Sequence, residues 1–111
     1  MSELVKVIES ESEFESIIKS GIVLIDFFAT WCAPCRQQLM ILEQVAETAG
    51  DNVTIAKVDT DNLQSLAAKF GIERIPTLIL FKDGVIVTQF TSVQQTATLK
   101  KAIESAAAKS N

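Results

Sequence analysis

The stretch IVLIDFFATWCAPCR, residues 22–36, decides the fold of this 111-residue chain. It starts with an almost wholly apolar run at 22–28 and continues into a Cys-Ala-Pro-Cys segment at 32–35. A continuous apolar run is typical of a strand that is covered on both faces, as in the centre of a parallel sheet. Because Pro34 suits the first turn of a helix, we predict a buried strand that leads into a helix opening at the two cysteines.

Hydrophobic periodicity on either side of this stretch predicts alternating strands and helices. Further strands are expected at 4–8, 53–58, 77–81 and 85–90, and helices at 12–20, 34–49, 61–70 and 95–108. Ser12 and Glu15 resemble a capping box for the first helix, and Asp83-Gly84 between two apolar runs indicates a hairpin. The order βαβαβαββα predicts an α/β fold, with right-handed crossovers between parallel strands and helices on both faces of one mixed sheet.

Length, charge and the apolar runs argue against a nucleic-acid-binding, lipid-binding or membrane-spanning protein. The length suits a single domain spanning 1–111, and a net charge of −4 does not favour binding to nucleic acid or anionic lipid. The first residues do not resemble a signal peptide, and the longest apolar runs, 22–25 and 78–81, are too short for a membrane span. We therefore expect a soluble cytoplasmic protein, in which a cysteine pair is more often catalytic or metal-binding than structural.

Cys32 and Cys35 are the only cysteines in the chain. A helix N-terminus stabilises a thiolate there and lowers the pKa of the thiol. Residues three apart on a helix are about 5–6 Å from each other, which suits a disulfide. The pattern favours redox exchange over three alternatives: a zinc site, which needs about four ligands in a chain without His, a structural disulfide, and two inert buried thiols.

Asp26 interrupts the apolar strand before the cysteines. Burial of a carboxyl raises its pKa, which allows it to exchange protons near neutrality. Asp26 is therefore a candidate base for Cys35, acting directly or through a water, and Lys57 on the adjacent predicted strand is its candidate partner. The alternatives are that Asp26 and Lys57 form only a buried ion pair, or that Lys57 is exposed to solvent.

Ile75-Pro76-Thr77 leads into the fourth predicted strand, and a proline is tolerated at the start of a strand because it need not donate to the sheet. A cis bond before Pro76 would leave the backbone groups of Ile75 free to pair with an extended peptide.

Together these segments resemble the thioredoxin family over nearly the whole chain. The matching segments are Asp26 to Arg36, Lys57-Val58-Asp59, Gly71 to Leu78 and Phe81-Lys82-Asp83-Gly84. The resemblance implies the thioredoxin fold: a single domain with a mixed, mostly parallel sheet of about five strands and four flanking helices. It also implies a cis-Pro76, Cys32 as the nucleophile, Cys35 as the resolving thiol, and Asp26 with Lys57 behind them.

The resemblance further implies a thiol–disulfide oxidoreductase that reduces protein disulfides and serves electron transport and cell redox homeostasis. Its implied partners are disulfide-containing proteins and a thioredoxin reductase, which passes on reducing equivalents from NADPH. The resemblance also implies a monomer that binds no cofactor of its own. The residues expected to contact protein partners are Trp31, Ala33, Pro34, Arg74, Ile75, Pro76 and Ser92.

Some positions depart from the family pattern. Ala33 stands where the family usually has Gly, and Arg74 stands beside the docking segment where a small residue is common. Thr91-Ser92-Val93 and Arg36 also differ from the usual residues. We expect a partner surface that is bulkier and locally more basic than usual. Two other functions stay open: a dithiol oxidase or isomerase, and a binding module in which the cysteine pair is incidental.

Overall fold

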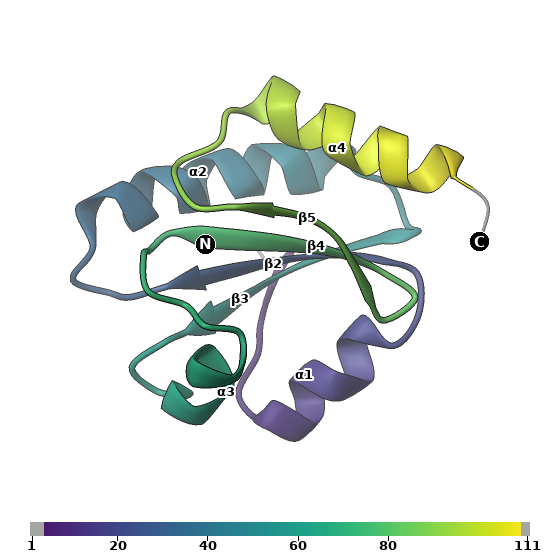
Figure 1. The fold of residues 1–111 in the computed structure, drawn as a ribbon. Coiled ribbons are helices and arrows are strands. Elements are labelled where there is room, and N and C mark those ends of the chain that lie inside the picture. Colours follow the sequence, from purple (N-terminus) through teal and green to yellow (C-terminus); the bar gives the residue numbers. More distant parts are fainter. Residues whose placement is uncertain (1–3, 110–111) are drawn as a thin grey trace.

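The computed structural model describes residues 4–109 and folds them into a five-stranded sheet with the strand order β1-β3-β2-β4-β5 (Figure 1). The strands are β1 (Val5–Val7), β2 (Ile22–Phe28), β3 (Val53–Asp59), β4 (Thr77–Lys82) and β5 (Val85–Phe90). The helices are α1 (Glu11–Ile18), α2 (Ala33–Thr48), α3 (Gln64–Lys69) and α4 (Thr96–Ala108). Helices α1 and α3 cover one face of the sheet, and α2 and α4 cover the other. The predicted α/β architecture is confirmed.

The directions of the strands follow from their connections. Strand β3 pairs in parallel with both β1 and β2, as the two crossovers through α1 and α2 predict. Strand β4 pairs antiparallel with β2, and β5 pairs antiparallel with β4. Four of the strands therefore point the same way, and β4 alone runs against them. Strand β2 has a neighbour on each side and a helix layer on each face, which explains its apolar sequence.

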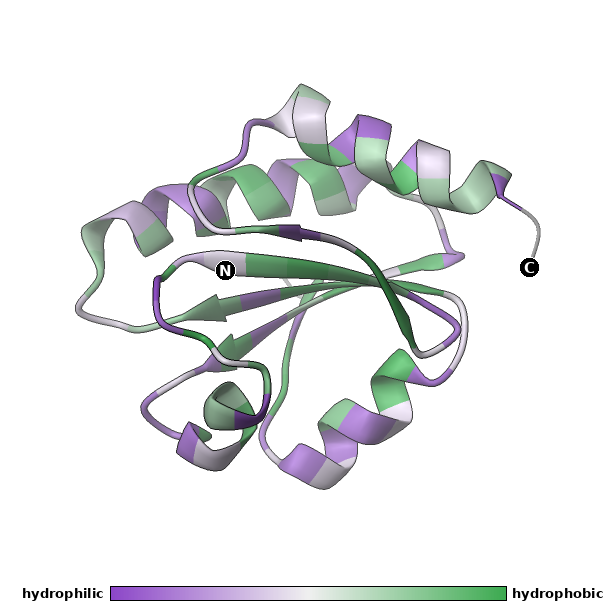
Figure 2. Ribbon diagram, in the orientation of Figure 1, coloured by the Kyte–Doolittle hydropathy of each residue, from purple (hydrophilic) through white to green (hydrophobic). Residues whose placement is uncertain are grey.

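Each face of the sheet has its own hydrophobic core, and Figure 2 shows the central strands coloured mainly as hydrophobic. One core packs α2 and α4 against the sheet through Leu42, Val45, Leu99 and Ile103. The opposite core is rich in phenylalanine: Phe14 lies at ring-centroid distances of 5.4 to 6.3 Å from Phe27, Phe70 and Phe81. Within residues 4–109, no helix combines the length and apolar character needed to cross a membrane.

The predicted hairpin between β4 and β5 is confirmed. Asp83 and Gly84 have φ values of 50° and 84°, and positive φ at both central residues is what a type I′ turn requires. The turn is also tied to the start of β2, because the N–H of Gly21 donates to Oδ1 of Asp83 at 2.8 Å and the N–H of Asp83 donates to the carbonyl oxygen of Gly21 at 2.9 Å.

Two predicted helix starts are wrong. The cap of α1 is Ser10 rather than Ser12: its hydroxyl accepts from the N–H of Glu13, whose carboxylate accepts in turn from the N–H of Glu9. Helix α3 begins at Gln64 rather than at 61, because turns that close on Asp59 occupy the preceding residues. The Asp59 carboxylate accepts from the N–H of Asp61 at 2.9 Å.

Candidate active site

The two cysteines lie at the start of α2 and are joined to each other as a disulfide. Cys32 is the N-cap of the helix, and its Sγ accepts from the backbone N–H of Cys35 at 3.2 Å. The Cα atoms are 5.2 Å apart, within the range predicted from the i, i+3 spacing. The structure is therefore that of the oxidised form, in which the two sulfurs are bonded to each other rather than present as separate thiols.

The helix start supplies the electrostatics of the site. Unpaired N–H groups at a helix N-terminus carry partial positive charge, which stabilises a thiolate at the N-cap position. Pro34 lies within the first turn, as predicted, where its missing N–H costs no hydrogen bond. Both cysteines are buried, at 5% exposed for Cys32 and 2% for Cys35. Cys32 is the slightly more accessible of the two.

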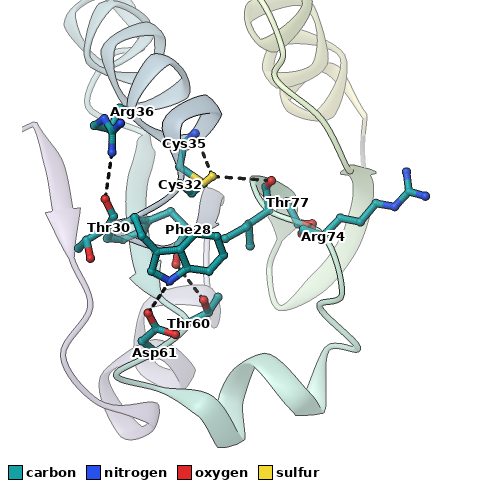
Figure 3. Close-up of a disulfide and its surroundings, with 11 residues drawn as sticks. Phe28, Thr30, Cys32, Cys35, Arg36, Thr60, Asp61, Arg74 and Thr77 are labelled. Atoms are coloured by element: carbon teal, nitrogen blue, oxygen red, sulfur yellow. Dashed lines mark hydrogen bonds between the residues drawn. A yellow bond between two sulfur atoms is a disulfide. The ribbon is translucent and has the colours of Figure 1, made fainter.

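The segment before β4 faces this disulfide. The Ile75–Pro76 bond is cis, as the resemblance implied, and Thr77 Oγ1 donates to the carbonyl oxygen of Arg74 at 2.5 Å. Sγ of Cys32 lies 3.9 Å from the carbonyl oxygen of Ile75. The Ile75 side chain packs on a small core formed by Ala29 and the two cysteines. Segments more than 40 residues apart in the chain therefore meet at one disulfide (Figure 3).

Asp26 lies in the middle of β2 and is 1% exposed. It is level with Lys57 in β3 and with Leu78 in β4. Alternation along β2 places it on the same face as Leu24, which packs in the core under α2. Neither carboxylate oxygen has a hydrogen-bond partner among the described residues. Desolvation raises the pKa of Asp26 from 3.8 to about 7, and the positive charge of Lys57 opposes that shift.

Lys57 is half-buried beside Asp26 on the paired strand. Its Nζ lies 5.5 Å from the ring centroid of Phe28, which favours a cation through the ring quadrupole. Among the described residues, Lys69 forms ion pairs with Glu11 and Glu15, and no ion pair joins Asp26 to Lys57. Asp26 and Lys57 therefore interact through space without a direct ion pair.

The rim of the site is formed by exposed residues from several loops. Trp31 is 68% exposed, and its Nε1 donates to the carboxylate of Asp61 at 3.0 Å. Ala33, Pro34, Arg74 and Ser92 are exposed as well. Figure 3 shows the Arg74 side chain extending away from the disulfide, while Arg36, on the other side of it, turns back and donates to the carbonyl oxygen of Thr30 at 3.2 Å.

Sequence reasoning missed two residues that support the site. Asp61 anchors Trp31, and Gln38 is a fully buried polar side chain in α2. The amide of Gln38 exchanges two hydrogen bonds with the backbone of Gln94, at 3.0 and 2.7 Å. A signal for Gln38 was present in the sequence: it lies on the buried stripe of α2 with Cys35, Ile41, Leu42 and Val45, and it is the one amide on that stripe.

The described part of the chain gathers no group of three or more His, Cys, Asp or Glu side chains that could hold a metal ion. The chemistry that the site offers comes from its own side chains: a sulfur pair on a helix N-terminus, a buried carboxyl beneath that helix, and a backbone carbonyl beside the outer sulfur.

Comparison with known proteins agrees with this geometry. The thioredoxin family model matches residues 5–105. Thioredoxin of Staphylococcus saprophyticus is 43% identical over 95 residues, which cover 86% of this chain and 91% of that protein. Chloroplastic thioredoxin Y2 of Arabidopsis thaliana is 45% identical over 82 residues, which cover 74% of this chain and 49% of that protein.

Among solved structures, a mutant thioredoxin from Halobacterium salinarum superposes with a TM-score of 0.87 at 32% identity, covering 100% of this chain and 98% of that one. The five-stranded mixed sheet with four helices is thus the thioredoxin fold. With the Cys32–Cys35 pair joined at the start of α2, this chain belongs to the thioredoxin family of thiol–disulfide oxidoreductases.

Proposed function

We propose that this protein works as a reductant of protein disulfides, in the cytoplasm, as a monomer. The observation that carries the proposal is the placement of Cys32, which caps α2 and lies 3.9 Å from the carbonyl oxygen of Ile75. An extended partner chain that pairs with the backbone of Ile75 would bring its own disulfide onto the sulfur that the helix N-terminus activates.

The reaction begins from the dithiol form. The thiolate of Cys32 attacks one sulfur of the partner's disulfide, so that a Cys32–partner bond forms while the partner's S–S bond breaks and its other sulfur leaves as a thiolate and takes up a proton. Cys35 then gives its proton to Asp26, directly or through a water, and attacks Sγ of Cys32. The Cys32–partner bond breaks as the Cys32–Cys35 bond forms, and the partner's second sulfur leaves as a thiolate that takes up the proton held by Asp26. The partner has then gained two electrons and two protons, and the Cys32–Cys35 disulfide remains.

Asp26 suits the role of proton acceptor for Cys35. A pKa of about 7 leaves a substantial fraction of the carboxyl ionised at neutral pH, and general bases work best with a pKa near the operating pH. Its oxygens are free to accept, since no described residue donates to them. Lys57 keeps the ionised form accessible, because its charge lowers the pKa that burial alone would give.

The partners that we propose are disulfide-containing proteins and a thioredoxin reductase that returns the disulfide to the dithiol with electrons from NADPH. The chain has two arginines, Arg36 and Arg74, and both lie at the rim of the disulfide. Ala33 adds a methyl group to the same rim. We infer that this surface selects partners differently from a thioredoxin with Gly between its cysteines. Because the net charge is −4, we also infer that neither nucleic acid nor a membrane surface is a partner.

Insulin reduction coupled to NADPH and thioredoxin reductase tests the function, with a family member carrying Cys-Gly-Pro-Cys as the comparison for partner selection. We expect catalytic insulin reduction, and a redox potential close to that of thioredoxin itself, which is about −270 mV. The double variant Cys32→Ser, Cys35→Ser is the control and should lose all activity. A potential of about −120 to −180 mV would instead identify an oxidase or isomerase, and a double variant that retains its cellular function would identify a binding module.

A further inference from the structure

Gln38 is buried in α2 one turn after Cys35, where its amide bonds to the backbone of a distant loop. Its Nε2 donates to the carbonyl oxygen of Gln94 at 3.0 Å, and its Oε1 accepts from the N–H of Gln94 at 2.7 Å. The side chain is 0% exposed. Both polar atoms are thus satisfied by one residue that lies 56 positions further along the chain. The paired bonds resemble those of two adjacent strands and fix the backbone at Gln94 in both position and orientation.

The loop held in this way, residues 91–95, joins β5 to α4. Strand β5 ends at Phe90, which pairs with Leu78 near the start of β4. Because the two strands are antiparallel, the chain leaves β5 beside the cis Ile75–Pro76 segment that faces the disulfide. Figure 1 shows this loop alongside the first half of α2. The loop therefore borders the same surface as Cys32 and Ile75.

Few other contacts hold the loop in place. Val93 packs against the core between the sheet, α2 and α4. The side chain of Gln94 donates to the carbonyl oxygen and the hydroxyl of Ser92 at 3.0 and 3.2 Å, which are contacts within the loop. The side-chain hydroxyl of Thr96, the first residue of α4, donates to the exposed side chain of Gln44 at 3.3 Å, and the N-cap residue of α4, Gln95, makes no side-chain capping bond. The buried amide of Gln38 is thus the polar link between the loop and the helix that carries the disulfide.

We propose that Gln38 is a positioning residue for protein substrates: it holds loop 91–95 at the edge of the disulfide, so that an extended partner chain meets a preformed backbone there. The proposal rests on the proposed function, because it concerns how a protein disulfide docks. A docking segment that is ordered for only part of the time lowers apparent affinity in proportion to that fraction. A small disulfide does not reach the loop, so its rate of exchange with Cys32 is independent of Gln38.

The test compares two disulfides with the same pre-reduced protein. Insulin serves as the protein disulfide and hydroxyethyl disulfide as the small one, and the fluorescence of Trp31, the single tryptophan, follows the oxidation of the protein. Gln38→Met keeps the length of the side chain and removes both hydrogen bonds. We expect the second-order rate constant with insulin to fall about three- to tenfold, while the rate constant with hydroxyethyl disulfide stays unchanged.

Gln44→Met is the matched control, because Gln44 lies in the same helix, reaches the start of α4 and is bonded there only to Thr96. We expect wild-type rate constants for it with both disulfides. Gln94→Gly loosens the loop without changing α2 or the core, and so keeps the proposal testable if Gln38→Met does not fold. It should lower the rate constant with insulin selectively.

Equal rate constants with insulin for wild type and folded variants would overturn the proposal, as would equal losses with both disulfides, which would assign Gln38 to the thiol chemistry. These outcomes differ from failure of the proposed function. In that case the wild-type protein itself would not reduce insulin, whatever residue stands at position 38.

Discussion

The buried carboxyl of Asp26 lowers the stability of the fold, and the same burial suits it to the proton transfer proposed for it. The carboxyl is buried without a hydrogen bond from any described residue, so its ionised form is unfavourable in the folded protein. A sheet centre built only for stability would carry an apolar residue there, like Leu24 two positions before it. The raised pKa of Asp26 reflects that cost, and it makes the stability of the fold depend on pH.

We predict that wild-type stability falls as the pH rises from about 4 to about 7, and that Asp26→Asn removes this dependence. The folded pKa of about 7 lies above the value of 3.8 for the unfolded chain, so the folded state binds more protons in this window and loses stability as they dissociate. Relative to wild type, the variant should gain roughly 3 kcal/mol between pH 5 and pH 8. Urea unfolding of both oxidised proteins at the two pH values measures this difference, and a pH-independent difference would contradict the shift.

Individual residues also show what the sequence can and cannot predict. Asp26 and the two cysteines are identifiable because each breaks a local pattern or sits at a predicted helix start. Gln38 and Asp61 were missed because their partners, Gln94 and Trp31, lie 56 and 30 positions away. Hydrophobic periodicity does not identify such a contact, because a hydrogen bond between segments far apart in the chain forms only once the sheet has brought them together.

Among the elements, the first turn of α2 contains Ala33, which stands where the family usually has Gly and is the simplest departure from the family pattern to interpret. Ala33 is the first residue of the helix, between an N-cap cysteine and a proline. Its φ does not lie in the positive region, which among the described non-glycine residues only Asp83 occupies. The native backbone therefore suits alanine, and glycine would gain nothing from its wider conformational freedom.

Ala33→Gly is accordingly expected to lower the free energy of unfolding by about 0.5–1 kcal/mol, mostly because glycine gives the unfolded chain more conformations to lose. The chemistry of Cys32 should be retained, since its sulfur and the N–H of Cys35 stay in place. Urea unfolding of the oxidised variant beside wild type is the measurement. A variant as stable as wild type would show that the turn is fixed by the disulfide and Pro34 alone.

Element boundaries are predictable to the extent that local patterns decide them. The apolar run of β2, the glycines after the helices and the Asp83-Gly84 turn act locally, and they place the sheet and the hairpin correctly. The start of α1 was misplaced because two overlapping Ser-x-x-Glu patterns compete there, at Ser10 and at Ser12. The start of α3 was misplaced because turns closed by Asp59 use the preceding residues, a preference that hydrophobic spacing does not record.

At the scale of the whole molecule, the redox-active disulfide lies outside the two hydrophobic cores that stabilise the sheet. The two cores on opposite faces contain most of the buried apolar side chains, and the cysteines belong to a separate small cluster with Ala29. Breaking the disulfide therefore leaves both cores intact. The effect of the disulfide on the free energy of unfolding therefore depends on the difference between the cost of closing the ring in the folded chain and the cost of closing it in the unfolded chain.

We predict that the oxidised protein is more stable than the reduced protein. Closing the small ring between Cys32 and Cys35 restricts the unfolded chain, which in the chain-entropy model stabilises the oxidised fold by about 2 kcal/mol. By linkage, the folded protein should then hold its disulfide more tightly than the unfolded chain by roughly 40 mV, as suits a reductant. Urea unfolding of the oxidised and the fully reduced wild-type protein at pH 7 measures the difference. A reduced form that is the more stable one is the signature of a strong oxidant, and it would reverse the proposed direction of electron flow even though the fold, the helix N-terminus and the cysteine pair were all correctly assigned.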